Sequence, residues 1–272
     1  MTGSLAFRAG ALLALVVTLG FLTVPLVSLF TDAGPGELLD SLGDPQATEA
    51  LWLSLKTSLA AIVIIIVVGT PAAYLVATRS FRGRPLVITL IELPLVLPPA
   101  AAGIALLASF GPKGALGGAV EDLGITLVLE TAGVVVALTF VSAPFYVRTA
   151  IAAFEAVDRD LLDASRTLGV DEARTFLRVA IPSAVAGLGS GLALAWGRAL
   201  GEFGATLMFA GSLQGITQTT PLAIFEFLSS DFTASLALSA VLVVVSAVLL
   251  LGVKLLVPKP FDARSTRQYP AP

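Results

Sequence analysis

The sequence contains neither cysteine nor histidine among its 272 residues. Disulfides, thiol nucleophiles, imidazole metal ligands and histidine proton relays are therefore excluded. The same absence excludes a metalloprotease of the HExxH type and a serine hydrolase with a histidine base. The chain also lacks the phosphate-binding loop G-x-x-x-x-G-K-[ST], so we expect that it does not hydrolyse ATP itself.

Charged residues are scarce, at 13% of the chain, whereas 56% of the residues are hydrophobic. The mean hydropathy is +0.94. A typical soluble domain carries about 25% charged residues, and a chain of this length could not hide so much apolar surface from water. The composition therefore predicts an all-α fold, a polytopic membrane helix bundle with lipid as the solvent over most of the chain.

Six apolar runs are long enough to cross a bilayer, for which about 20 residues are needed. They cover residues 9–30, 52–77, 86–110, 125–147, 183–210 and 236–257. The first run is too long for the core of a signal peptide, so we expect a retained helix. We divide the chain into a first helix with an acidic outer loop (1–50), a membrane core (51–257) and a tail (258–272). The tail holds four prolines in fifteen residues, which predicts disorder.

Basic residues gather on one side of these spans. With the N-terminus inside, 13 of the 16 lysines and arginines fall on or near the cytoplasmic side: Arg8, Arg79, Arg82, Arg84, Arg148, Arg159, Arg166, Arg174, Arg178, Lys254, Lys259, Arg264 and Arg267. The outer segment 31–50 has five acidic residues and no basic residue. The positive-inside rule therefore predicts a multi-pass protein of the cell membrane with both termini in the cytoplasm.

The inner segment 148–182 is the longest predicted loop, and its pattern predicts two short helices joined by a turn. Asp158 or Asp160 can cap the first helix, and Asp171 can cap the second. Gly169 follows the first helix, where a left-handed backbone is common. Four residues of the first helix share one face at helical spacing: Leu161, Leu162, Ser165 and Leu168. The next span is expected to begin at Pro182.

The residue string in this loop resembles the permease signature of ABC importers, which reads Glu-Ala-Ala, three residues, Gly, nine residues and Ile-x-Leu-Pro. The chain has Asp163-Ala164-Ser165, then Gly169, then Val179-Ala180-Ile181-Pro182, and the spacing matches without a gap. Two residues depart from the signature, namely Asp163 for glutamate and Ser165 for alanine. The resemblance implies an ATPase-coupling helix with these functional residues: Asp163, Ala164, Ser165, Gly169, Ile181 and Pro182. An amphipathic linker on the membrane surface is the alternative interpretation of the helical pattern.

The rest of the core, from Trp52 to Val257, is similar to molybdate permeases. The most specific stretch is Arg-Ala-Leu-Gly-Glu-Phe-Gly-Ala-Thr-Leu-Met-Phe-Ala-Gly at residues 198–211. Segments 95–107, 110–114, 140–148 and 217–224 also resemble that group. Sulfate and tungstate permeases share the Gly-Glu-Phe-Gly-Ala centre and usually differ in the residues after it.

The resemblance implies a transport subunit and not an enzyme. ATP and Mg²⁺ would bind to a separate cytoplasmic ATPase, and this chain would hold no cofactor or metal of its own. An extracellular or periplasmic binding protein would deliver molybdate, with tungstate tolerated. ABC transporters use two ATPase subunits, and one copy has a single coupling loop, so we expect a homodimer. Membrane lipid is the other partner, and no nucleic acid is expected.

Prolines and ionisable residues at membrane depth are candidates for the transport pathway or gate. We assign Pro98, Pro99, Arg198, Gly201, Glu202, Phe203, Gly204 and Thr206 to it, because freed backbone groups and charges in a membrane usually line a cavity or a bundle interior. Each feature has a structural alternative. The prolines could only kink a helix, Arg198 and Glu202 could be only an intramembrane ion pair, and the glycines could serve helix packing alone.

Other functions fit the sequence less well. A sulfate or tungstate permease of the same class differs only in substrate. An ion-coupled secondary transporter is disfavoured by the signature in the loop and by the lack of an internal repeat. An intramembrane enzyme is disfavoured because no nucleophile–base pair or metal cluster stands out. With acidic residues outnumbering basic ones within the spans, a strong resident anion site is not expected.

Overall fold

The computed structural model describes residues 2–32, 34, 36, 40 and 43–256, and the predicted tail 258–272 lies outside this part. The described residues form helices and no strand. Their bounds are α1 Thr2–Asp32, α3 Pro45–Thr78, α4 Arg84–Val96, α5 Pro99–Phe110, α6 Gly117–Asp122, α7 Thr131–Glu155, α8 Arg159–Thr167, α9 Glu172–Thr175, the π-helical turn η1 Phe176–Ala180, α10 Ile181–Leu200, α11 Gly204–Ala210, α12 Thr220–Ser230 and α13 Phe232–Leu256. The all-α prediction is confirmed.

Five helices in the described part are long and apolar enough to cross a membrane, and a sixth span results if the bent pair α4 and α5 is counted as one. The two members of this pair meet at an angle of 116°. The break falls at Leu97 and Pro98, between Pro94 inside α4 and Pro99 at the start of α5. Proline cannot donate a backbone hydrogen bond and disfavours a helical residue before it, so this run cannot form one straight helix. The expectation of about six spans is confirmed.

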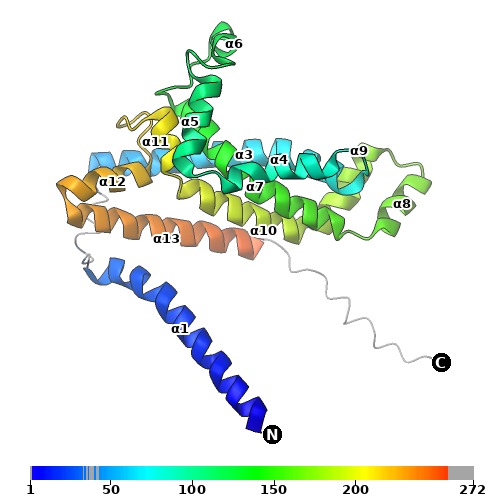
Figure 1. Cartoon of the computed structure of the whole chain (residues 1–272), viewed down its shortest axis with the longest axis horizontal. Coiled ribbons are helices and arrows are strands. Elements are labelled where there is room, and N and C mark those ends of the chain that lie inside the picture. Colours follow the sequence, from blue (N-terminus) through cyan, green and yellow to red (C-terminus); the bar gives the residue numbers. More distant parts are fainter. Residues whose placement is uncertain (1, 33, 35, 37–39, 41–42, 257–272) are drawn as a thin grey trace.

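Helix α7 lies at the centre of the bundle, between α3 and α10 (Figure 1). Small residues let these helices approach closely: Ala73, Ala150 and Ala184 are almost fully buried. Such packing is typical of membrane helices, where close backbone approach replaces the hydrophobic effect as the source of association. The bundle has one end with the α8–α9 loop and an opposite end with α12, here called the α8 end and the α12 end.

Helix α4 is attached to α7 by charge as well as by apolar contact. Arg148 of α7 forms an ion pair with Glu92 of α4 at 2.8 Å, and Arg84 at the start of α4 forms one with Glu155 at the end of α7. No residue of α4 is fully buried. The predicted set of inner-side arginines therefore includes two that join helices of the bundle.

Helix α1 stands apart from the bundle (Figure 1) and packs mainly on α13. No residue of its apolar window is buried within the chain. Its uniformly apolar surface, with Leu and Val residues on all sides, suits a helix that is surrounded by lipid or by another protein.

Three predicted boundaries are wrong. The fourth span was expected over 125–147, but α7 begins at Thr131 and continues to Glu155. The loop expected over 148–182 is therefore shorter, because α7 extends into it from one side and a helix that begins at Glu172 extends from the other. The span expected over 183–210 ends at Leu200, and α11 follows as a separate short helix.

Candidate functional site

The loop at the α8 end folds as its turn residues predict. The Asp158 carboxylate caps α8 by accepting the Asp160 backbone N–H at 3.0 Å, and the Asp171 carboxylate caps α9 by accepting the Arg174 N–H at 2.8 Å. Gly169 has a φ of +77°. This left-handed conformation reverses the chain after α8, and glycine adopts it without steric cost. The predicted helix–turn–helix is confirmed.

The second helix of this loop differs from the prediction, since no break separates it from the next span. Helix α9, the π turn η1 and α10 form one continuous helix from Glu172 to Leu200. Pro182 therefore lies inside this helix, in the first turn after η1, and does not begin it. The π turn, with its wider hydrogen-bond spacing, is a form that is often found at functional sites. Ile181 is half-buried, and Pro182 is exposed.

The faces of α8 divide differently from the predicted single apolar face. Leu162, which belongs to the buried core cluster of the bundle, and Ser165 face inward, whereas Leu161 is 50% exposed and Leu168 is 83% exposed. Ala164, three residues after Leu161, is also exposed. Helix α8 therefore presents a stripe at i, i+3 and i+7 that no described residue covers, defined by Leu161, Ala164 and Leu168. We call it the outer stripe of α8.

Ser165, predicted as one of the coupling residues, does not lie on the outer stripe. Its side chain is 8% exposed and shares a hydrogen bond of 2.9 Å with the hydroxyl of Thr175, which is fully buried. A hydroxyl is therefore useful at this position, where the signature has alanine, because it satisfies Thr175. Asp163 is exposed, and its carboxylate accepts a hydrogen bond of 2.9 Å from Arg166 within α8.

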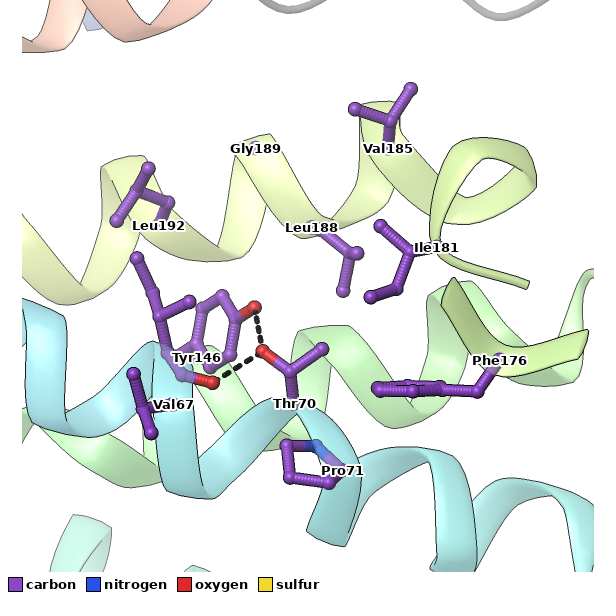
Figure 2. A pocket seen from close by; sticks show the side chains of 11 residues that line it. Val67, Thr70, Pro71, Tyr146, Phe176, Ile181, Val185, Leu188, Gly189 and Leu192 are labelled. Carbon is purple, nitrogen blue, oxygen red and sulfur yellow. Dashed lines mark hydrogen bonds between the residues drawn. The ribbon is translucent and has the colours of Figure 1, made fainter. Parts of the chain in front are cut away.

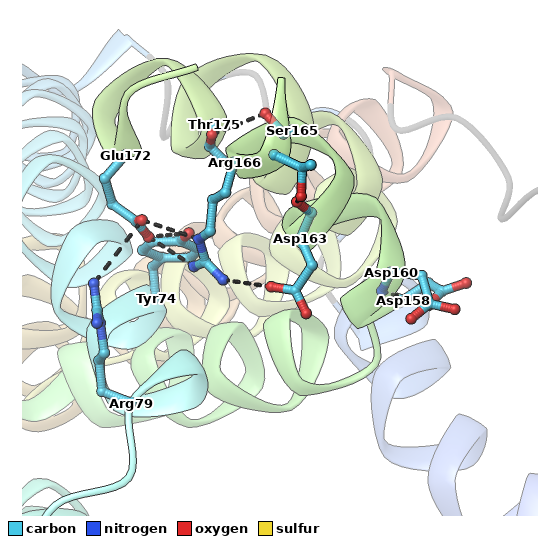
Figure 3. Close-up of polar contacts among 10 residues, drawn as sticks. Tyr74, Arg79, Asp158, Asp160, Asp163, Ser165, Arg166, Glu172 and Thr175 are labelled. Atoms are coloured by element: carbon cyan, nitrogen blue, oxygen red, sulfur yellow. Dashed lines mark hydrogen bonds and ion pairs between the residues drawn. The ribbon is translucent and has the colours of Figure 1, made fainter. Parts of the chain in front are cut away.

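Arg166 and Glu172 join the two halves of the loop (Figure 3). The Arg166 guanidinium donates to both carboxylate oxygens of Glu172, at 3.0 and 3.2 Å. These hydrogen bonds raise the pKa of Arg166, so it is permanently charged. Both side chains are about 40% exposed, so the pair stabilises the fold by about 1 kcal/mol at most. The pair is of interest because it joins α8 to α9, and not because of its contribution to stability.

The same carboxylate reaches the membrane bundle. The Tyr74 hydroxyl of α3 donates to Glu172 at 2.8 Å, and Arg79 lies 3.9 Å away at the end of α3. The Tyr74 ring packs against Phe154 of α7 and Phe176 of η1, with centroid distances of 5.4 and 4.9 Å. Sequence reasoning missed this cluster, because only the Asp163–Arg166 spacing of three residues hinted at a pair and the partner on α3 is distant in the chain.

An apolar cavity of about 450 Å³ lies between α3 and α10, beside the π turn (Figure 2). Its lining includes Ile181 and Val185 of α10, Phe176 of η1, Thr70 of α3 and Tyr146 of α7. The hydroxyls of Thr70 and Tyr146 bond to one another at 2.7 Å. With these polar groups satisfied, the cavity offers no free partner to a charged ligand.

Two helix breaks that contain or adjoin residues predicted for the pathway meet in the structure. One separates α4 from α5 at Leu97 and Pro98, and the other separates α10 from α11 at residues 201–203. A Cβ added to Gly204 would lie 2.8 Å from the Pro99 Cβ, so the two breaks are in direct contact. The structure thus brings together residues that are about a hundred positions apart in the sequence.

Glu202 is the buried charge at this junction, with 1% of its surface exposed. One of its oxygens accepts the Ala205 backbone N–H at 2.7 Å and so caps α11. The other lies 2.5 Å from the Arg198 guanidinium, as an ion pair without hydrogen-bond alignment. Thr206 is fully buried, and its hydroxyl has no hydrogen-bond partner among the described residues. Gly201 is exposed, and the Phe203 ring packs on Phe225 of α12 at 5.1 Å.

These features define a polytopic membrane transport subunit: interrupted helices meet at membrane depth, and a structured loop outside the spans presents an apolar stripe. In the described part of the chain, no cluster of three or more acidic side chains could hold a metal ion.

Comparison with known families gives the more specific assignment. The family described as "Binding-protein-dependent transport system inner membrane component" matches residues 65–261. The chain belongs to this family. It is therefore the permease subunit of an ABC importer, a multi-pass membrane protein and not an enzyme.

Three relatives bear on the substrate. The chain is 37% identical to the "Probable transport system permease protein NifC" of Clostridium pasteurianum, over 86% of this chain and 82% of the relative. It is 42% identical to the "Molybdenum transport system permease protein ModB" of Mycobacterium tuberculosis, over 90% of this chain and 92% of the relative. It is 32% identical to the "Sulfate transport system permease protein CysW" of Escherichia coli, over 89% and 84%.

A solved structure has the same fold. It is the crystal structure of a bacterial ABC transporter involved in the import of the acidic polysaccharide alginate. The TM-score is 0.74 at 16% identity, and the match covers 93% of this chain and 94% of the other. The fold of an ABC importer's transmembrane subunit is thereby confirmed.

Proposed function

We propose that this chain is the permease of an importer that carries molybdate into the cytoplasm, with tungstate tolerated. The observation that carries the proposal is the 42% identity over 90% of the chain to a molybdenum permease, against 32% to a sulfate permease. Molybdate and tungstate are similar in size and charge, so a weak passage can hardly distinguish them. We assign the selection of the anion to the extracellular or periplasmic binding protein that delivers it.

The proposed docking site for the cytoplasmic ATPase is the outer stripe of α8. Leu168 is 83% exposed although it is a large apolar residue, and its neighbours Leu161 and Ala164 extend the stripe. An apolar stripe on a helix that no described residue covers suits insertion into a groove of a partner. The exposed carboxylate of Asp163 adds a charge beside it. Docking of a cytoplasmic ATPase on this stripe requires that the α8 end of the bundle faces the cytoplasm.

The proposed pathway runs along the junction of the two helix breaks. Its polar groups are few: the Arg198–Glu202 pair, the Thr206 hydroxyl and backbone groups freed at the breaks. Glu202 neutralises Arg198, so the pathway holds no strong cationic cage. A dianion would therefore pass through weakly, and affinity would reside in the binding protein.

We propose a homodimer, with one ATPase subunit on each coupling loop and the pathway between the two copies. The expected mass of the purified assembly corresponds to two copies of this chain and two of the ATPase. Native mass spectrometry measures that stoichiometry directly. A monodisperse, active complex with a single copy of this chain would contradict the homodimer.

Sulfate is the second candidate substrate, because of the 32% identity to a sulfate permease. The test is uptake by proteoliposomes that contain the chain with its ATPase and its binding protein. We expect saturable, ATP-dependent uptake of molybdate that unlabelled tungstate inhibits and that sulfate in equal concentration leaves nearly unchanged. Preferential, saturable uptake of sulfate would overturn the substrate while it leaves the importer assignment intact.

A further inference from the structure

Helix α8 is attached to the rest of the chain by few contacts. It packs mainly on α9 and η1, and only Leu162 and Ser165 of its nine residues are buried. The attachment is therefore narrow. A movement of α8 that follows binding of a partner to its outer stripe can reach the membrane helices through the charged groups at this attachment, in addition to the buried Leu162 and the hydrogen bond between Ser165 and Thr175.

Among the charged groups at this attachment, Glu172 has partners on both sides. On one side Arg166 of α8 donates to both of its carboxylate oxygens, at 3.0 and 3.2 Å. On the other side Tyr74 of α3 donates to it at 2.8 Å. Glu172 itself begins the continuous helix that ends at Leu200. One carboxylate thus connects α8, α3 and the helix that reaches the break beside Glu202.

We propose that Glu172 is a positioning residue that transmits the movement of α8 to α3 and α10, through Arg166 on one side and Tyr74 on the other. The inference rests on the proposed function, in which a partner ATPase docks on α8. It adds a role to Arg166 and Glu172, which stand at positions that the signature leaves unspecified, and to Tyr74 of α3. We call the three hydrogen-bonded residues Arg166, Glu172 and Tyr74 the joint (Figure 3).

The surroundings of the joint allow such a movement. Phe176, in the π turn directly after α9, contacts the Tyr74 ring at 4.9 Å. The same Phe176 side chain lines the apolar cavity between α3 and α10 (Figure 2). A displacement of Tyr74 or of α9 therefore meets free volume on the far side of Phe176. A close-packed interior would resist the same displacement.

The test measures coupling in the reconstituted complex of this chain, its ATPase and its binding protein. For each variant we would record ATPase retained on purification, ATP hydrolysed and molybdate taken up. The variants are Glu172→Gln, which loses the charge, Arg166→Lys, which keeps the charge but loses the planar fork, and Tyr74→Phe, which loses only the hydroxyl. Arg174→Gln is the matched control, because Arg174 pairs with Asp171 at 3.2 Å in the same loop and is not part of the joint.

We expect Glu172→Gln to retain the ATPase and hydrolyse ATP while molybdate uptake per ATP falls by about fivefold or more. Tyr74→Phe and Arg166→Lys should lower the same ratio to a smaller extent, and Arg174→Gln should leave it unchanged. A merely structural role would lower assembly and hydrolysis together and would leave this ratio constant.

Two results would overturn the role that we propose for the joint. One is an unchanged ratio of uptake to hydrolysis in Glu172→Gln. The other is loss of the ATPase from that variant together with a normal ratio in Tyr74→Phe, since Glu172 would then only shape the docking surface. If the unaltered chain neither retains an ATPase nor supports ATP-dependent uptake, the proposed function itself fails, and that outcome is distinguishable from both.

The cavity offers a second, independent variant. Val185→Phe adds a ring on the α10 side, where the side chain has room in the resting structure. If the π turn needs the cavity in order to move, this variant should assemble normally and lose uptake per ATP hydrolysed. Normal coupling in Val185→Phe would contradict the role assigned to the cavity.

Discussion

Gly169 shows how a single residue constrains the loop. Its φ of +77° is the left-handed region, and a Cβ at this position would meet no atom within 4 Å. The cost of a substitution is therefore only backbone strain, and the position tests the turn without a clash. Sequence reasoning predicted this residue correctly, because a glycine directly after a capped helix commonly adopts the left-handed conformation that ends the helix.

We expect Gly169→Val to weaken the turn by about 1–2 kcal/mol, because a β-branched residue is unfavourable at positive φ. The protein should still insert into the membrane, whereas retention of the ATPase and molybdate uptake should fall. Gly169→Asn is the matched control, since asparagine tolerates this conformation. Equal uptake by the valine variant and the unaltered chain would mean that the loop is a passive linker.

Arg198 and Glu202 form the second residue-scale case. Arg198→Ala leaves the buried Glu202 carboxylate without its counter-charge, which costs about 3–5 kcal/mol when a buried pair is broken. We expect a lower melting temperature of the purified protein, measured by intrinsic fluorescence. The double variant Arg198→Ala with Glu202→Gln should recover stability, because glutamine can still accept the Ala205 N–H.

Transport separates the two roles of this pair. Recovery of molybdate uptake in the double variant would mean that Arg198 serves only to neutralise Glu202. Recovery of stability without uptake would instead support contact between Arg198 and the anion.

At the scale of elements, α11 is held by close backbone contacts. A Cβ on Gly103 of α5 would lie 2.6 Å from the Ala205 carbonyl oxygen and from the Met208 Cβ of α11. We expect Gly103→Ala to destabilise the fold by about 1–3 kcal/mol through overpacking, measured by thermal unfolding in detergent. Gly118→Ala in α6 is the control, because nothing lies within 4 Å of that position. Equal melting temperatures for both variants would show that α11 is free to shift away from α5.

The sequence predicted which segments are helical, but it did not predict several of the residues at which helices begin or end. No proline marks the break after Leu200, although Gly201, Glu202 and Gly204 lie in or beside it. It is accompanied by a local cap, in which Glu202 accepts the Ala205 N–H, and by a long-range contact, in which Gly204 packs on Pro99. Conversely, Pro182 suggested a helix start, yet the helix continues through it because η1 absorbs the missing hydrogen bond. Contact with the distant Pro99 contributes to the first case, and the local π turn to the second.

The caps and the turn of the α8 loop could be predicted from the sequence. Which residues of α8 face inward could not. Local rules predicted Asp171 and Gly169 and restricted the first cap to Asp158 or Asp160, since capping depends on neighbours in the chain. The inward position of Ser165 and the partners of Glu172 depend on where α3 and α9 lie. A helical pattern alone could not distinguish the buried Leu162 from the exposed Leu168.

At the scale of the whole molecule, the absence of cysteine allows a direct test of orientation. Asp160→Cys in α8 and Gly118→Cys in α6 would each introduce a single exposed thiol. With a membrane-impermeant maleimide, we expect labelling of Gly118→Cys in intact spheroplasts and of Asp160→Cys only after permeabilisation. The unaltered chain gives the background. The reverse pattern would contradict the positive-inside orientation.

The number of residues in the continuous α9–α10 helix, which contains the π turn, is fixed by contacts at both of its ends. Each residue advances a helix by about 100°, so removing Arg178 from η1 would rotate one side of the helix against the other by that angle. At one end Thr175 must face Ser165, and at the other Gly191 must face Thr149 of α7. A helix shortened by one residue cannot meet both demands. The number of residues between Gly169 and Val179, which is nine, is therefore constrained by the fold independently of which residues they are.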